Sequence, residues 1–134
     1  MTSFTPRRDI PRRVVVTGMN GVTSLGSDWA SIEANIRAGR NGIRTMHDWA
    51  GIEGLLTHLA GPIPDFSKPA HYTRKQTRSM GRVAIMATRS AEVALTEADL
   101  LNNPCITDGR MGVAYGSCIG STDATINFAK MYID

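Results

Sequence analysis

Apolar positions along the chain follow two spacings, which together predict an alternation of strands and helices. Residues 13–17 (RVVVT) form a continuous β-branched run, which is typical of a strand buried on both faces of a parallel sheet. Residues 111–116 (MGVAYG) alternate larger side chains with glycine and alanine, which is the period of a second strand. We therefore expect one strand near each end of the chain.

Three further segments carry the spacing of amphipathic helices. The first runs from a cap at Ser27 or Asp28 to a glycine at position 39. The second, rich in alanine, runs from about Thr73 or Thr77 to Ala98, and the third begins at residues 121–123. Their apolar stripes are formed by Trp29, Ile32 and Ile36, by Val83, Ala87, Ala91 and Leu95, and by Ile126, Ala129 and Ile133.

The remaining segments carry weaker patterns. Residues 43–72 predict mostly loop, with a short helix between Trp49 and Leu59 ahead of a proline-rich stretch. Residues 1–11 are polar, contain two prolines, and predict a loose arm. The order strand, helix, loop, helix, strand, helix favours an α/β fold with a mostly parallel sheet. The 134 residues are enough for one domain.

Composition excludes several classes of protein. Apolar residues make up 42% and charged residues 20%, and no uncharged apolar run is long enough to cross a membrane. Two isolated cysteines provide neither a disulfide framework nor metal-ligand spacing, which agrees with a reducing cytoplasm. The net charge of +3 comes with none of the patterns of nucleic-acid-binding modules. We expect a cytoplasmic protein without a metal, a membrane or a nucleic acid as partner.

The segment 116–120 (GSCIG) raises the question of a catalytic cysteine, because its shape puts Cys118 in the slot of a nucleophile elbow. A nucleophilic thiolate needs a nearby base, and His47, His58 and His71 lie upstream in loop-like or weakly patterned sequence. The interpretation we favour is a small apolar residue under a tight turn. It predicts a core thiol without catalytic function.

A nucleotide site is a second hypothesis. Residues 14–21 (VVVTGMNG) combine a strand pattern with glycines ahead of a helix, as dinucleotide-binding units do. However, Gly18, Gly21 and Gly26 do not have the spacing G-x-G-x-x-G, and Val22 occupies the slot of a motif glycine. No acidic residue closes a second strand about 20 residues later to bind a ribose.

Several segments, taken in order, resemble the amino-terminal part of β-ketoacyl-[acyl carrier protein] synthases, above all the elongating synthase II type. They are residues 12–19 (RRVVVTGM), 23–26 (TSLG), 39–43 (GRNGI), 74–80 (RKQTRSM), 98–100 (ADL), 110–113 (RMGV) and 116–120 (GSCIG). The resemblance implies a thiolase-like fold, a five-layered αβαβα arrangement of two similar halves. Residues 1–134 then form the first part of the amino-terminal half.

The resemblance also implies a function. Synthases of this type are homodimeric acyltransferases that elongate fatty acids by decarboxylative Claisen condensation of an acyl thioester with malonyl carrier protein. Their catalytic cysteine and two histidines lie farther along than residue 134, so no catalytic residue is carried over and the segment alone is expected to be inactive. They need no cofactor of their own, because phosphopantetheine arrives on the acyl carrier protein.

Two site hypotheses accompany this function. Arg74, Lys75 and Arg78 form a basic turn, and the resemblance puts Lys75 and Arg78 at carrier-docking positions. It puts Ile119 at the far end of the acyl pocket. A non-catalytic acyl-binding or dimerisation remnant, and an NAD(P)-binding domain like that of short-chain dehydrogenases, are the alternatives. A segment with a sheet edge and a close-packing face uncovered is expected to need more protein around it.

Overall fold

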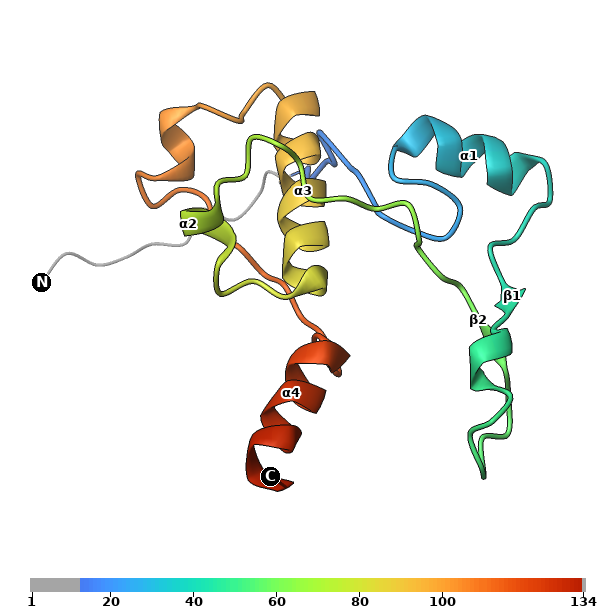
Figure 1. Cartoon of the computed structure of the whole chain (residues 1–134). Helices are drawn as coiled ribbons and strands as arrows, with labels where there is room; N and C mark the ends of the chain where they lie inside the picture. Colours follow the sequence, from blue (N-terminus) through green and yellow to red (C-terminus); the bar gives the residue numbers. More distant parts are fainter. Residues whose placement is uncertain (1–12, 134) are drawn as a thin grey trace, which may run out of the picture.

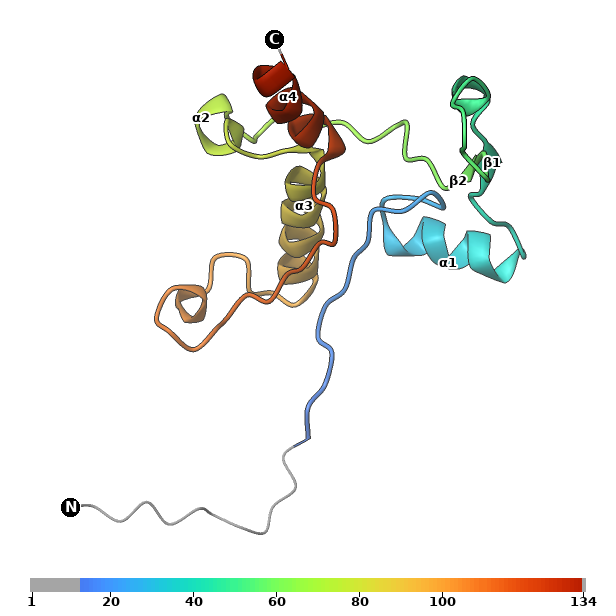
Figure 2. The ribbon, with the colours of Figure 1, turned by 90° about the horizontal axis from the view of Figure 1, so that it is seen from below.

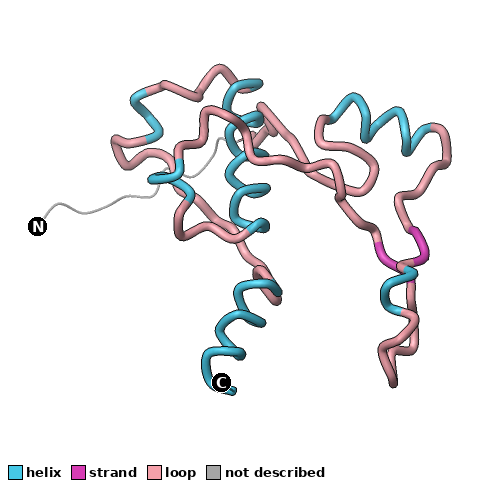
Figure 3. The backbone as a smooth tube through the Cα atoms, in the orientation of Figure 1, coloured by secondary structure: helices cyan, strands magenta, loops and turns pink. Residues whose placement is uncertain are grey.

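The structure, a computed structural model, describes residues 13–133, and helices and long loops make up most of it (Figures 1 and 3). The predicted loose arm at residues 1–11 lies outside the described residues. The helices are α1 (Trp29–Arg37), α2 (Arg74–Thr77), α3 (Arg82–Glu97) and α4 (Thr122–Ile133), with 3₁₀ turns η1 (His47–Trp49) and η2 (Pro104–Ile106). Two short strands, β1 (Arg44–Thr45) and β2 (Leu59–Ala60), pair in antiparallel fashion.

Helix α1 forms where its caps and apolar stripe predict it. Asp28 is the N-cap, and its carboxylate accepts a hydrogen bond from the backbone N–H of Ser31 at 2.8 Å. Gly39 ends the helix with a φ of +66°, a conformation that glycine adopts without strain. Ile32, at the centre of the stripe, is 6% exposed and is the one buried apolar side chain of residues 13–133.

The long helix predicted from residue 73 or 77 to Ala98 is divided into α2 and α3. Thr73 caps α2 through a capping box with Gln76, and the helix ends after one turn. The end at Ala98 is as predicted. Gly81 is the N-cap of α3 and lies against the start of α4, because a Cβ on Gly81 would lie 2.1 Å from the Oγ of Ser121. A glycine is needed where the starts of α3 and α4 meet.

The two predicted strands of a parallel sheet are not formed in the described part of the chain. Residues 14–17 and 113–115 belong to no strand, and Val14 and Val113 are each 95% exposed. A strand is defined by its hydrogen-bonded neighbour, and neither segment has one within residues 13–133. The sheet that does form joins two segments for which the sequence predicts mostly loop.

Helix α3 lies at the centre of the arrangement, with α2 on one side and α1 with the β1–β2 pair on the other (Figures 1 and 2). The loop after residue 13 is held against the end of α3, where the N–H of Met19 donates to the carboxylate of Glu97 at 2.7 Å. Large apolar side chains of α4 are exposed, including Ile126, Phe128 and Met131. No described helix combines the length and the apolar character needed to cross a membrane.

Candidate functional site

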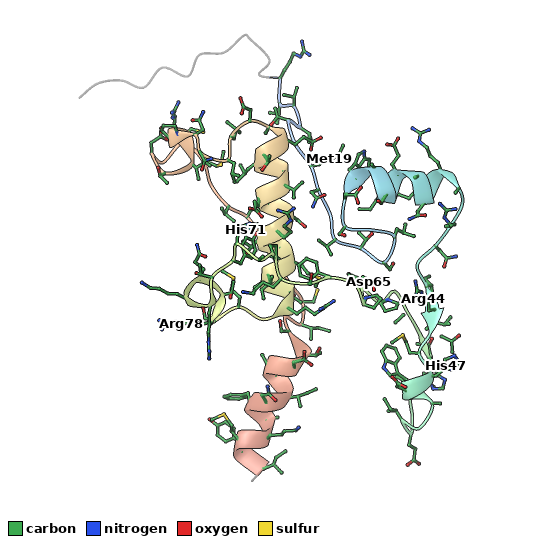
Figure 4. The ribbon with its side chains drawn as sticks, turned by 45° about the horizontal axis from the view of Figure 1, so that its top comes forward. Met19, Arg44, His47, Asp65, His71 and Arg78 are labelled. Atoms are coloured by element: carbon green, nitrogen blue, oxygen red, sulfur yellow. The ribbon has the colours of Figure 1, made fainter. Side chains whose placement is uncertain are left out.

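The predicted docking residues form one exposed group, which we call the basic turn: Arg74 and Lys75 on α2, and Arg78 directly after it. The capping box fixes the start of the turn, since the Thr73 N–H donates to Gln76 Oε1 at 2.9 Å. None of its three side chains forms an ion pair within residues 13–133. Figure 4 shows Arg78 pointing away from α3. The turn therefore offers positive charge to an external partner.

The two residues ahead of Thr73 are attached to α3 by a group that we call the Glu92 cluster. One carboxylate oxygen of Glu92 lies 2.6 Å from Nε2 of His71, and the other accepts the hydroxyl of Tyr72 at 2.8 Å. Arg89, one turn earlier on α3, donates to the second oxygen at 2.7 Å. The His71 and Tyr72 rings meet edge to face, with centroids 4.7 Å apart. His71 lies beside α3 (Figure 4).

The charge state of the cluster follows from these contacts. Partial burial by itself raises the pKa of Glu92, but hydrogen bonds from Arg89, Tyr72 and His71 outweigh it and lower this pKa from 4.5 to about 2. The carboxylate therefore contributes stability above about pH 4.5, and that contribution is lost as the pH falls towards 2. Burial, together with the hydrogen bond to Glu92 and its negative charge, raises the pKa of Tyr72 to about 12. Tyr72 thus remains a donor at neutral pH.

A second attachment holds the same segment to the start of α3. The guanidinium of Arg82 donates to the carbonyl oxygen of Phe66 at 3.2 Å and to that of Ile63. It also lies 5.6 Å from the centroid of the Phe66 ring, within the range of a cation–π contact. Within the segment, the ammonium group of Lys68 donates a hydrogen bond to the Tyr72 carbonyl oxygen at 2.5 Å. Residues 63–72 are therefore bound to both halves of α3.

Sequence patterns did not reveal these attachments. Glu92 lies 20 residues from Tyr72, and a glutamate on an amphipathic helix is ordinarily a solvated side chain. The capping box was the one local signal, since Thr73 and Gln76 have the spacing S/T-x-x-E/Q. The basic turn itself was found in the sequence, whereas the residues that hold it were not.

The glycine turn 116–120 is exposed along its whole length. The N–H of Gly120 donates to Ser117 Oγ at 2.9 Å, and Gly120 has a φ of +70°, which favours glycine. Ile119 is 73% exposed. Cys118 is exposed as well, so the prediction of a core thiol is wrong for the described chain. Its sulfur has no hydrogen bond from a histidine of residues 13–133, and an activated nucleophile is not assembled there.

The geometry around Gly18 also argues against the nucleotide hypothesis. A phosphate-binding turn leads from a strand into a helix and leaves its backbone N–H groups free. Here a Cβ on Gly18 would lie 2.1 Å from the Ala94 carbonyl oxygen. Gly18 therefore packs directly against the backbone of α3. Residues 14–17 form no strand, and α1 begins only at Trp29. Within the described residues, no group of three side chains suits a metal ion.

Comparison with known proteins decides the family. Residues 11–132 match the model of the β-ketoacyl synthase N-terminal domain. The chain belongs to the β-ketoacyl synthase family. The crystal structure of a β-ketoacyl synthase from Burkholderia phymatum STM815 superimposes with a TM-score of 0.82 and 52% sequence identity, over 92% of this chain and 30% of that one. The predicted thiolase-like α/β fold, of which this chain is the first part, is confirmed.

Curated relatives of this synthase segment agree. The 3-oxoacyl-[acyl-carrier-protein] synthase 2 of Staphylococcus aureus (strain COL) is 34% identical over 112 residues, which cover 84% of this chain and 27% of that protein. Nodulation protein E of Rhizobium meliloti (strain 1021) is 34% identical over 119 residues, covering 85% of this chain and 28% of that protein. The chain thus spans less than a third of these relatives. The docking role of Lys75 and Arg78 and the pocket role of Ile119 stay predictions.

Proposed function

We propose that this chain is the amino-terminal segment of a β-ketoacyl-[acyl carrier protein] synthase that elongates acyl chains by decarboxylative Claisen condensation. The main support is the 52% identity to a β-ketoacyl synthase of known structure over 92% of the chain. In this reaction a cysteine takes the acyl group from its thioester. Malonyl carrier protein then loses carbon dioxide, and the resulting carbanion attacks the acyl carbonyl, which expels the cysteine thiolate and leaves the β-ketoacyl group on the carrier. We propose that this segment docks the carrier protein, forms part of the wall of the acyl pocket and supports the fold. It does not supply the catalytic cysteine.

The partner that we propose is an acyl carrier protein, which is acidic and carries its acyl group on phosphopantetheine. The basic turn suits it, because Arg74, Lys75 and Arg78 are exposed and lack ion-pair partners within residues 13–133. Complementary charge steers such encounters and fixes their orientation. We further propose that the enzyme acts in the cytoplasm as a homodimer.

The proposal is tested with a chimeric synthase, in which this chain replaces the matching segment of the Burkholderia phymatum enzyme. We expect the chimera to condense an acyl thioester with malonyl carrier protein, releasing carbon dioxide and forming a β-ketoacyl product that mass spectrometry detects. The 134-residue chain alone should form none. A folded, dimeric chimera without condensation activity, beside an active parent enzyme, would favour a non-catalytic remnant.

Replacing Ile119 by phenylalanine tests the pocket role. A hydrogen bond from the Gly120 N–H to Ser117 Oγ closes the turn that carries Ile119, and the Ile119 side chain is exposed. The larger ring would occupy space needed by the end of an acyl tail, and we expect the chimera to lose about tenfold in kcat/KM for long-chain substrates. Short-chain transfer should change little. Ile119→Leu is the matched control, and an equal loss at every chain length would indicate misfolding instead.

Replacing Cys118 by alanine tests whether this exposed thiol takes part in catalysis. The Cys118 side chain is exposed in the described chain, so we expect the Cys118→Ala chimera to stay within about twofold of the unmodified activity. The isolated chain should form no acyl adduct with an acyl thioester. A stoichiometric adduct that mass spectrometry maps to Cys118 would overturn this assignment of the catalytic centre.

A further inference from the structure

The position of the basic turn depends on the segments that flank it. Among the described residues, α2 is not packed broadly on α3. Residues 71 and 72, immediately before the Thr73 cap, are instead held by the carboxylate of Glu92. The chain then returns to α3 at Gly81. The basic turn is therefore exposed and lies between two points of attachment to α3, the Glu92 cluster before it and the start of α3 after it.

We propose that Glu92 is a positioning residue for the basic turn: by binding His71 and Tyr72 it fixes the start of α2 and so orients Lys75 and Arg78 towards the acyl carrier protein. This inference rests on the proposed function and adds to it a residue that makes no contact with the carrier. Arg89 holds the same carboxylate from within α3, so Glu92 is fixed before it binds the loop. The Glu92 side chain is only 20% exposed, so water competes less for the hydrogen bonds of its carboxylate.

The sign of the expected effect separates positioning from plain electrostatics. Neutralising Glu92 makes the surface more positive, and charge alone would then tighten the binding of an acidic carrier. A positioning role predicts weaker binding instead, because the basic turn, once released from Glu92, would have to be ordered each time the carrier binds. Glu97, on the same helix, is the matched control. It carries the same charge but accepts its hydrogen bond from the Met19 N–H and not from His71 or Tyr72.

The test compares Glu92→Gln with Glu97→Gln in the chimeric synthase, using malonyl carrier protein and, separately, a malonyl thioester of pantetheine without the carrier. For Glu92→Gln we expect KM for the carrier substrate to rise about fivefold, with kcat and the carrier-free reaction unchanged. Tyr72→Phe removes a single donor and should raise this KM in the same direction to a smaller extent. An unchanged or lower KM for Glu92→Gln, or the same rise in both reactions, would overturn the proposal.

A double-mutant cycle tests whether Glu92 acts through the basic turn. In a Lys75→Ala, Arg78→Ala background, Glu92→Gln should have no further effect on KM for the carrier substrate. Independent, additive effects would overturn the positioning role. If the Lys75→Ala, Arg78→Ala change itself leaves that KM unaltered, the docking role under the proposed function fails. If it raises KM while Glu92→Gln does not, only the inference about Glu92 fails.

Discussion

Gly18→Ala is expected to detach the loop at residues 13–20 from α3 and to cost about 3 kcal/mol of folding free energy. A Cβ at this position would lie 2.1 Å from the Ala94 carbonyl oxygen and 3.2 Å from the Ala98 nitrogen. These are backbone atoms of the last turn and the C-cap of α3, so they cannot move aside as the end of a flexible side chain can. Such a loss is a large share of the stability of a typical domain.

Urea denaturation of the chimeric synthase carrying this substitution, followed by circular dichroism, measures this loss. Gly51→Ala is the matched control, because a Cβ there has no atom within 4 Å. Hydrogen exchange at the Met19 N–H, which bonds to Glu97, reports the detachment directly. Equal stability of the two variants, with Met19 still protected, would contradict the close packing of Gly18 on α3.

Reversing the charge of the basic turn is expected to weaken carrier binding strongly. In the chimeric synthase, Lys75→Glu with Arg78→Glu should raise the dissociation constant for acyl carrier protein by about 10- to 100-fold at low salt. Two attractive contacts with an acidic surface become repulsive, and no carboxylate of residues 13–133 pairs with either side chain to offset the change. The difference should shrink at high ionic strength, because salt screens exposed charges.

Fluorescence anisotropy of labelled carrier protein measures this effect across a salt series. Arg13→Glu with Arg44→Glu is the control, since it changes the net charge by the same amount at exposed positions outside the turn. An unchanged affinity of the folded Lys75→Glu, Arg78→Glu enzyme would rule out docking at this turn. An equal loss in the control would show that net charge, and not the location of the charge, governs binding.

Local signals in the sequence predicted the helices well. Asp28 and Gly39 bound α1, and Ala98 closes α3, because caps and apolar stripes act over a few residues. The ordered set of short motifs also predicted the family, which the match of residues 11–132 to the β-ketoacyl synthase N-terminal domain confirms. The basic turn was found in the same way, from charges adjacent along the chain.

Contacts between distant residues were beyond these signals. The predicted helix from residue 73 or 77 is divided ahead of Gly81, a glycine that lies against Ser121, forty residues later. Val14 and Val113 carry strand-like patterns, yet residues 13–133 offer them no hydrogen-bonded neighbour. The exposure of Cys118 has a related cause, since a thiol is buried only where other segments cover it.

By itself, the sequence determined both ends of α1, the end of α3, the start of α4, the basic turn and the family. Tertiary structure alone decided how the basic turn is held, since the carboxylate of Glu92 meets His71 and Tyr72 only once α3 and the preceding loop lie together. The physical reason is the separation along the chain over which each kind of interaction acts. Helix caps and stripes are interactions between neighbours in the chain, whereas strand pairing, burial and the Glu92 cluster require segments brought together by folding.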